Sequence, residues 1–418
     1  MRHHLNVFGR KLSQRGAAAL PVGVLLLFIA ALVLIAVSRT TLMEQRISGN
    51  EIRARQALQA GQAGISHAMA YMKAGGIDRV SPTNQADAIT SLTLSTGASY
   101  QVYYCDPSPS SMPAVYPLVD ACDNQASRPN CGAGFTASAN YAIPLVLACG
   151  RSDDAIALQP GVVSFSRATT MTDSPDNPVI SKGTLNVQGS ATVTNYFNNL
   201  TIWTGGPTES IGNSGKTFIR NPNIPQPKMT ESPPSDIPTS CKANDKYICV
   251  TDKTAKGPDV IDEDLTLKNM PDEDMFRNYF GHDFVTYRDE IATRVITSAQ
   301  AGSLVTSGGE AIVITGSTTS VSLPNGTIGS TANPVVLIIE GNWNQGGTTT
   351  VYGVVYVMGS MGVQGNVTVY GNVSVEGGVA GTGSLDVIYD PFANNDGSNK
   401  LQELGKPGIL SGSWRDWL

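Results

Sequence analysis

Charged side chains are scarce in this sequence: Asp, Glu, Lys and Arg make up only 15% of its 418 residues. The net charge is −6, and no stripe of basic residues follows the long apolar segment near the N-terminus. Because nucleic-acid binding needs a clustered positive surface, the composition argues against a nucleic-acid-binding protein.

Residues typical of catalytic centres are also rare. No H-x-x-x-H pair occurs, and no Ser-His-Asp or Cys-His group is suggested by the four histidines (His3, His4, His67 and His282). The few acids of the glycine-rich C-terminal region do not recur in register, as the carboxylate pair of a glycan-cleaving enzyme would (Glu340, Glu376 and Asp386). We therefore expect a structural protein, with no catalytic residues and no cofactor.

The sequence lacks the C-x-x-C pairs that many zinc sites use. Its six cysteines all follow the apolar segment (Cys105, Cys122, Cys131, Cys149, Cys241 and Cys249). An even number suits disulfide bonds in an oxidising compartment, with free buried thiols as the alternative. Pairing of neighbours would join Cys105 to Cys122, Cys131 to Cys149 and Cys241 to Cys249, although six cysteines allow fifteen connectivities.

Acidic residues are missing before Glu44, and four basic residues precede a single long apolar run (Arg2, Arg10, Lys11 and Arg15). From Ala17 to Val37 the run holds 21 apolar or small residues (37 − 17 + 1). As a helix it would rise about 31 Å, close to the thickness of a bilayer core. The sequence thus predicts one membrane helix. Since basic residues lie on both sides of it, the cysteines decide the orientation and place the C-terminal part in the periplasm.

Three interpretations of this N-terminal segment compete. A secretory signal would be cut near Ala36-Val37-Ser38, and a plain anchor would stay uncut. A class III leader would be cut between Gly16 and Ala17 and leave the apolar run on the mature protein. The third interpretation is favoured because the chain continues beyond Val37 with small and apolar residues at helical spacing (Ala54, Leu58, Gly61, Ile65, Met69 and Met72).

Taken together, these features resemble the PilX group of type IV pilus minor pilins. The resemblance rests on Arg15-Gly16, the apolar run and a polar pattern after it (Arg39-Thr40-Thr41, Glu44, Arg46, Gly49-Asn50 and Arg55-Gln56-Ala57-Leu58-Gln59-Ala60). It implies cleavage and N-methylation by a prepilin peptidase in the inner membrane. Assembly with other minor pilins and the major pilin in an extracellular pilus would follow, with a tip adhesin as a further partner.

Two other functions remain open at this point. A pseudopilin of a type II secretion system would need the same membrane helix. A surface adhesin or a solenoid enzyme could instead be anchored by an uncut helix.

One residue departs from the pattern that the resemblance implies. Major pilins usually carry Glu at the fifth mature position, where its carboxylate offsets the N-terminal ammonium of an adjacent subunit in the apolar fibre core. Counted from Ala17, the fifth residue is Pro21, which carries no charge. This predicts a subunit at or near the fibre tip, with a merely permissive position as the alternative.

The sequence divides into a leader (1–16), a membrane or pilin helix (17–76), a pilin-like β head (77–170), the start of a β region with a Pro-rich and helical insertion (171–300) and a C-terminal β-solenoid (301–418). The head is predicted from its strand-like runs. In the insertion, a helix should begin after Pro271 and end at Gly281. Its buried face should hold Met275, Phe276, Tyr279 and Phe280.

The clearest repeat is a glycine at every sixth position (Gly341, Gly347, Gly353, Gly359, Gly365, Gly371, Gly377 and Gly383). Apolar residues, mostly Val, fill the second and fourth places after many of them. Because six is even, every repeat presents the same positions to the same face. This predicts a parallel β-solenoid with Val inside and Trp414 and Trp417 as candidate caps, in an overall α+β fold. An antiparallel meander is the alternative.

A weak calcium pattern remains near the C-terminus. Asn394, Asp396 and Glu403 fit the third, fifth and twelfth places of a calcium loop, but Phe392 stands where Asp is required. We expect a hydrogen-bonded turn there and assign no metal site.

Overall fold

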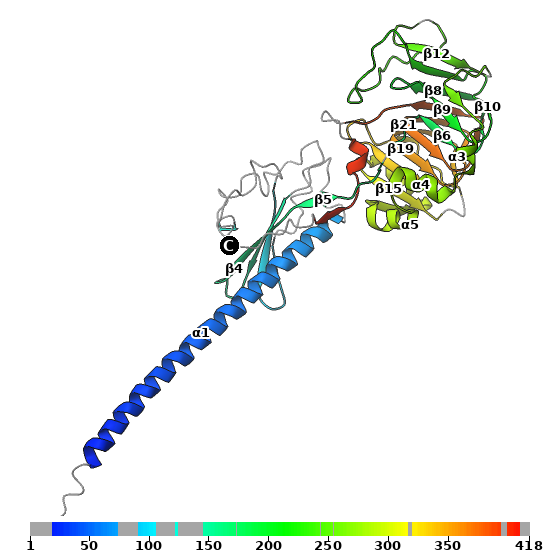
Figure 1. The fold of residues 1–418 in the computed structure, drawn as a ribbon. Coiled ribbons are helices and arrows are strands. Elements are labelled where there is room, and N and C mark those ends of the chain that lie inside the picture. Colours follow the sequence, from blue (N-terminus) through cyan, green and yellow to red (C-terminus); the bar gives the residue numbers. More distant parts are fainter. Residues whose placement is uncertain are drawn as a thin grey trace, which may run out of the picture.

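The computed structural model describes residues 19–73, 91–105, 122–123, 145–172, 174–242, 244–253, 255–316, 320–393 and 399–409. A long helix projects from the rest of the molecule, a small antiparallel sheet lies beside its C-terminal half, and a larger coiled β region follows (Figure 1). The α+β class predicted from the sequence is confirmed.

Helix α1 (Ala19–Lys73) runs without interruption for 55 residues, a length of about 80 Å. Its single proline, Pro21, lies in the first turn, where a missing backbone N–H leaves no helical hydrogen bond unmade. The helix therefore continues well past the apolar run, as the sequence predicts.

The sheet beside α1, here called the head sheet, is antiparallel with the order β1-β2-β3-β4. Its strands are β1 (Ser91–Thr93), β2 (Ser99–Cys105), β3 (Leu145–Arg151) and β4 (Leu158–Val163). The central strands β2 and β3 are in register from Ser99 opposite Arg151 to Cys105 opposite Leu145. One face of this sheet packs on the C-terminal half of α1 and forms a core of small and aromatic side chains.

Both ends of the coiled β region return to the head. Strand β5 (Phe165–Arg167) pairs antiparallel with β24 (Pro407–Ile409), and β24 also contacts α1. Beyond this pair, the Ala168 amide donates to the Lys406 carbonyl at 3.0 Å. Two chain segments more than 200 positions apart thus connect the head to the coiled β region.

The strands of the coiled β region form a narrow and a wide sheet, and from β17 to β23 successive strands alternate between the two. The narrow sheet has the order β10-β7-β22-β20-β18, from β7 (Leu185–Val187), β10 (Thr208–Ser210), β18 (Trp343–Gln345), β20 (Met361–Val363) and β22 (Val379–Gly381). The wide sheet includes β6 (Val179–Ser181), β8 (Ser190–Asn195), β9 (Ile202–Thr204), β11 (Lys216–Arg220), β12 (Tyr247–Asp252), β13 (Val260–Ile261), β14 (Arg294–Thr297), β15 (Ala311–Thr315), β16 (Gly326–Ile328), β17 (Val335–Ile339), β19 (Thr348–Val357), β21 (Asn366–Val375) and β23 (Ser384–Ile388).

Three glycine intervals make one rung of this region. Val351, Val369 and Val387 lie opposite one another on β19, β21 and β23, each 18 positions after the last (369 − 351 and 387 − 369). These pairs are parallel, as are those joining β15, β17 and β8 to the same stack, which excludes the antiparallel meander. The predicted parity is confirmed, since the in-register valines are all buried inside the stack.

The stack combines two distant parts of the chain. Strand β8 pairs with β23 and β7 pairs with β22, so residues 185–195 form the rung that follows residues 379–388 in space. The glycine spacing at Gly183 and Gly189 therefore belongs to the same array as the C-terminal glycines.

Short helices cover the outer face of the wide sheet (Figure 1). They are α3 (Leu265–Asn269), α4 (Asp272–Phe280), α5 (Phe284–Thr286), the π-helical turn η4 (Tyr287–Ile291) and the 3-10 helix η6 (Lys400–Glu403). The 3-10 helix η5 (Ser298–Thr306) instead packs Ala301 and Leu304 against the core inside the stack. Helix α4 begins after Pro271 and ends at Gly281, which has a φ of 73°. Met275, Phe276 and Phe280 are buried and Tyr279 is partly buried, as predicted. The candidate caps Trp414 and Trp417 lie outside the described residues.

Candidate functional site

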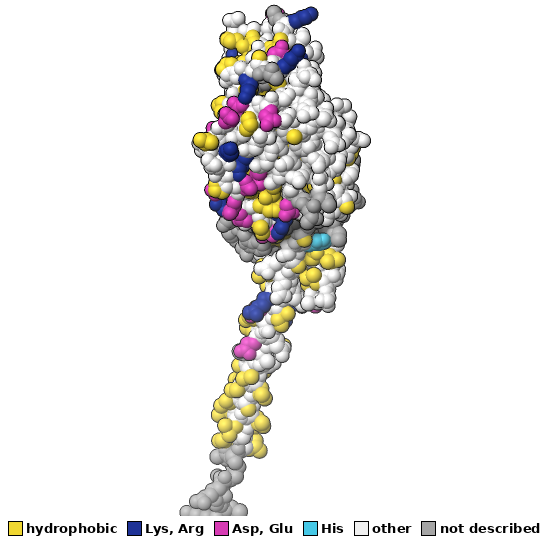
Figure 2. All heavy atoms as spheres, turned by 90° about the vertical axis from the view of Figure 1, so that its right-hand side faces the viewer, with side chains coloured by type: hydrophobic (Ala, Val, Ile, Leu, Met, Phe, Trp, Pro, Cys, Tyr) yellow, Lys and Arg dark blue, Asp and Glu magenta, His cyan; other side chains and the backbone are white. Residues whose placement is uncertain are grey.

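The N-terminal half of α1 is covered by no other part of the described protein. Every large hydrophobic side chain from Leu20 to Val37 is exposed, from 48% for Ile29 to 75% for Leu20. Figure 2 shows hydrophobic side chains along the face of the projecting helix that is turned toward the viewer. A surface of this size requires a nonpolar partner, either lipid or protein. By length and composition, this helix could cross a membrane.

The predicted processing residues Gly16 and Ala17 lie outside the described residues. Pro21 lies in the first described turn of α1, and Val37 marks the end of the uncharged run within the continuous helix. Pro21 brings no charge to the exposed apolar surface.

Charged residues appear on α1 only after the apolar run. Arg39, Glu44 and Arg46 are exposed and make no ion pair with any described residue. Arg55 pairs with Glu51 one turn before it at 2.5 Å. Arg53 makes the first polar contact with the head, with 2.5 Å between its Nε and Asp154 Oδ2. Hydrogen bonds from the Ser152 hydroxyl and the Ile156 amide lower the pKa of Asp154, and Arg53 adds to this effect.

The C-terminal half of α1 meets the head sheet through its smallest residues. Ala57, Ala60, Gly61, Gly64 and Ala68 are buried. A Cβ atom on Gly150 of β3 would lie 2.0 Å from the Ala57 carbonyl oxygen and 2.3 Å from the Gly61 nitrogen, so helix and strand touch backbone to backbone.

This contact corrects the helical stripe predicted from the sequence. Of its residues, Gly61 and Ile65 are buried, Leu58 and Met69 are half-buried and Ala54 is exposed. The observed contact runs from Ala57 to Ala68 and includes Gly61 and Gly64, because the close approach of β3 selects small residues over large apolar ones.

Family comparison addresses this helix directly. Residues 15–66 match the family model described as PilX N-terminal. Residues 15–66 are therefore similar to the N-terminal segment of PilX-type pilins. The resemblance predicted from the sequence is confirmed for these residues, and it supports a structural role connected with type IV pili. No curated protein and no solved structure matches the chain.

The segment matched by the PilX N-terminal model spans both halves of α1. It includes the exposed apolar surface and most of the small residues that contact the head, and ends one residue before His67. His67 Nδ1 lies 2.7 Å from the Tyr100 hydroxyl of β2. Sequence reasoning missed this polar contact, because nothing near His67 in sequence indicated its partner.

The cysteines are joined partly as predicted. Cys241 and Cys249 form a disulfide, as expected for neighbours. Cys122 is bonded to Cys149 with Cα atoms 5.7 Å apart, so the predicted pairs Cys105–Cys122 and Cys131–Cys149 are wrong. The short turn at residues 122–123 places Cys122 against the face of β3, whereas Cys105 ends β2 opposite Leu145, four positions from Cys149. Cys131 lies outside the described residues.

Other candidate residues do not converge on one place. Of the calcium candidates, Asn394 and Asp396 lie outside the described residues, and Glu403 ends η6. The described residues contain no cluster of His, Cys, Asp or Glu that could hold a metal ion. Glu340 follows β17, Glu376 follows β21 and Asp386 lies on β23, so these acids are on different strands.

Proposed function

We propose that this protein is a minor pilin-like structural subunit of a type IV pilus. One observation carries the proposal: a single uninterrupted helix, matched by the PilX N-terminal family, has an uncovered apolar half and a half bound to a folded head. Such a helix can first sit in the inner membrane and then pack beside the helices of other minor pilins and of the major pilin.

Processing would prepare this helix for transfer from lipid to fibre. A prepilin peptidase would cut between Gly16 and Ala17 and methylate the new N-terminus, leaving the apolar half on the mature protein. Mass spectrometry of the mature protein should find N-methylated Ala17 at its start. An intact N-terminus, or a start at Ser38 or Arg39, would instead identify an anchored or secreted surface protein.

The remaining regions would act outside the membrane. We interpret the coiled β region as a short β-solenoid displayed by the head, with a tip adhesin as one candidate partner. The division of the chain at residues 16, 76, 170 and 300 is part of this proposal, with β24 added to the head because it pairs with β5. Disulfides at Cys122–Cys149 and Cys241–Cys249 suit an oxidising periplasm.

Loss of the gene distinguishes a pilus from a secretion system. A strain lacking this protein should lose surface pili and retain secretion of extracellular enzymes. The reverse phenotype would assign the protein to a type II secretion system as a pseudopilin.

Pro21 suggests a position at or near the tip, where no preceding neighbour must be neutralised. A large displayed region also suits a terminal position, because it would obstruct repeated stacking along a thin fibre. Pro21→Glu should then leave pilus number within about twofold of wild type, since an added carboxylate is tolerated where the site is not enclosed. Counting pili by electron microscopy tests this, and complete loss of pili would contradict the tip position.

A further inference from the structure

The outward face of the narrow sheet differs from the rest of the coiled β region in charge. Figure 2 shows charged side chains gathered along one flank of this region, beside a broad face nearly free of them. The outward positions of the narrow strands carry Asn344, Gly362, Ala380, Asn186 and Glu209. Glu209 is the only charged residue among these five, and its carboxylate accepts a hydrogen bond from Asn186 Nδ2 at 2.5 Å.

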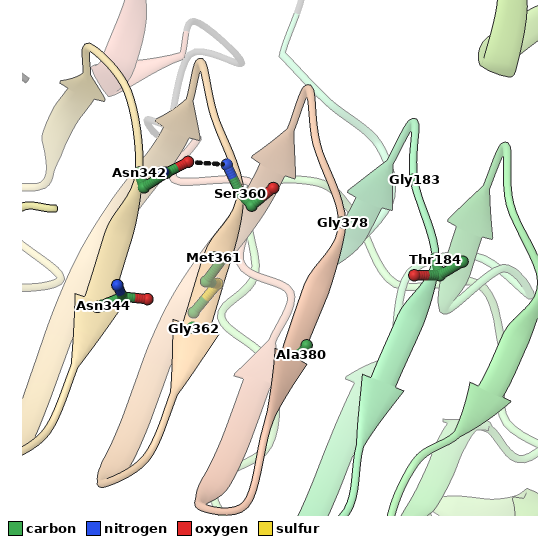
Figure 3. A pocket seen from close by; sticks show the side chains of 9 residues that line it. All are labelled: Gly183, Thr184, Asn342, Asn344, Ser360, Met361, Gly362, Gly378 and Ala380. Carbon is green, nitrogen blue, oxygen red and sulfur yellow. Dashed lines mark hydrogen bonds between the residues drawn. The ribbon is translucent and has the colours of Figure 1, made fainter. Parts of the chain in front are cut away.

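A shallow groove of about 480 Å³ lies in this face. Its floor is the backbone of β20 and β22, where Gly362, Gly378 and Ala380 leave no long side chain above the sheet (Figure 3). Asn342, just before β18, and Asn344 on β18 form one wall, and Thr184, just before β7, forms the other. These walls are three strand spacings apart, roughly 14 Å.

The walls and rim offer hydrogen-bonding groups of both kinds. Asn344 Nδ2 donates to the Ser320 hydroxyl at 2.7 Å, while its Oδ1 lies over Gly362, only 2.0 Å from where a Cβ atom would be. Asn342 Oδ1 accepts a hydrogen bond from the Ser360 amide at 2.8 Å. The Asn342 Nδ2 group therefore points away from that amide. The hydroxyls of Ser360 and Thr184 have no protein partner among the described residues.

This chemistry selects one class of ligand. A nucleic acid or an acidic polymer requires cations, which the groove lacks. A membrane or an apolar helix requires exposed hydrophobic side chains, and the floor offers little more than the Ala380 methyl group. Sugar hydroxyls both donate and accept hydrogen bonds, as the amides and hydroxyls of this groove do. We propose that the groove binds a segment of an uncharged polysaccharide, laid across the bare backbone of β20 and β22.

Direct binding measurements test this site. Full-length protein in detergent micelles is titrated with neutral hexasaccharides of glucose, galactose or mannose and with a neutral galactomannan. Polygalacturonate, single-stranded DNA and anionic vesicles serve as charged comparators. At least one neutral glycan should bind, with an affinity independent of salt, because no ion pairs form.

Substitutions at one position then locate the binding. Ala380→Arg fills the floor of the groove and should weaken glycan binding at least about tenfold, the equivalent of roughly 1.4 kcal/mol. Ala380→Ser keeps a small neutral side chain and should bind within about twofold of wild type. Thr348→Arg adds the same charge at an exposed position of β19, which is in the other sheet, and should also bind normally.

Three results would overturn the proposal: no neutral glycan binds, glycan binds equally well to Ala380→Arg, or only a charged comparator binds at this face. Unfolding temperatures of the variants show whether each is folded. If Ala380→Arg is unstable, protection of Asn344 and Thr184 backbone amides from hydrogen exchange by the glycan provides the second measurement. Absence of such protection in the wild-type protein would also contradict the site.

Discussion

Glu376 is a carboxyl group buried between the wide sheet and helix α4. It is 9% exposed, and its Oε1 accepts a hydrogen bond from the Tyr356 hydroxyl at 2.7 Å. The Tyr356 ring meets Phe276 and Phe280 of α4 with centroids 5.3 Å apart in each case. Burial raises the pKa of Glu376 to about 7; the Tyr356 hydrogen bond and Lys182 oppose this rise, while Asp272 adds to it.

This pKa makes stability depend on pH. In the unfolded chain Glu376 would titrate near 4.5, so between pH 4.5 and 7 the folded protein holds a proton that the unfolded chain has lost. The free energy of unfolding should therefore fall as pH rises through this range, by about 2 kcal/mol after allowance for solvent screening. Glu376→Gln should remove this loss, so that the variant exceeds wild type at pH 8 and matches it near pH 4.5.

Denaturant unfolding followed by tryptophan fluorescence measures this effect, because Trp343 is fully buried in the coiled β region. Glu290→Gln is the matched control, since Glu290 is exposed on η4 and its change should leave the pH dependence intact. Equal pH dependence in wild type and Glu376→Gln would show that another group is responsible.

At the scale of elements, the position of α1 on the head sheet depends on glycines, which carry no side chain, at the point where the helix crosses β3. Gly150 and Gly61 allow the two backbones to approach, and Tyr100 and Ala148 then pack against Gly64. The ion pair between Arg53 and Asp154 lies at the edge of this contact and is partly exposed. It therefore contributes less to stability than the backbone contact does. The position of the apolar half relative to the head depends on this backbone contact.

Gly150→Ala should separate α1 from the head sheet. Its Cβ would collide with the backbone of Ala57 and Gly61, which cannot move aside as a flexible side chain could. We expect a loss of about 3 kcal/mol in unfolding free energy, at the upper end for an added methyl group in a packed core. Gly49→Ala is the control, because its Cβ would meet no atom closer than 4.0 Å and should stabilise the helix slightly. Hydrogen exchange of the backbone amides of residues 57–68 is measured in both variants. Unchanged protection in Gly150→Ala would contradict the proposed role of the backbone contact.

The sequence predicted elements far better than the contacts between them. A six-residue period fixes which face each Val occupies, so the buried column of Val351, Val369 and Val387 was predictable. The period does not determine how many intervals close one rung, nor that β8 pairs with β23 across almost 200 positions. The disulfide between Cys122 and Cys149 could not be predicted from the sequence either, because it depends on where a turn lies over β3.

At the scale of the whole molecule, apolar surface and polar surface are separated along one direction. The uncovered part of α1 ends near Glu51, after which contacts with the head begin at Arg53 and Ala57. The head and coiled β region have their own buried cores, to which residues before Arg53 contribute no side chain. The exposed apolar surface and the buried cores thus reside in different segments of the chain.

Removal of the uncovered segment should consequently release a folded, soluble protein. A chain that begins at Ser48 keeps Arg53 and every buried residue of α1, whereas it loses the exposed surface from Leu20 to Ile47. After secretion to the periplasm, this chain should appear in the soluble fraction with the Cys122–Cys149 bond formed. A chain that begins at Ala17, supplied with the same targeting signal, should remain in the membrane fraction. Circular dichroism and the absence of free thiols would establish folding; a folded Ser48 chain that still sediments with membranes would show that a second surface attaches it, and that the apolar half of α1 is not the sole anchor.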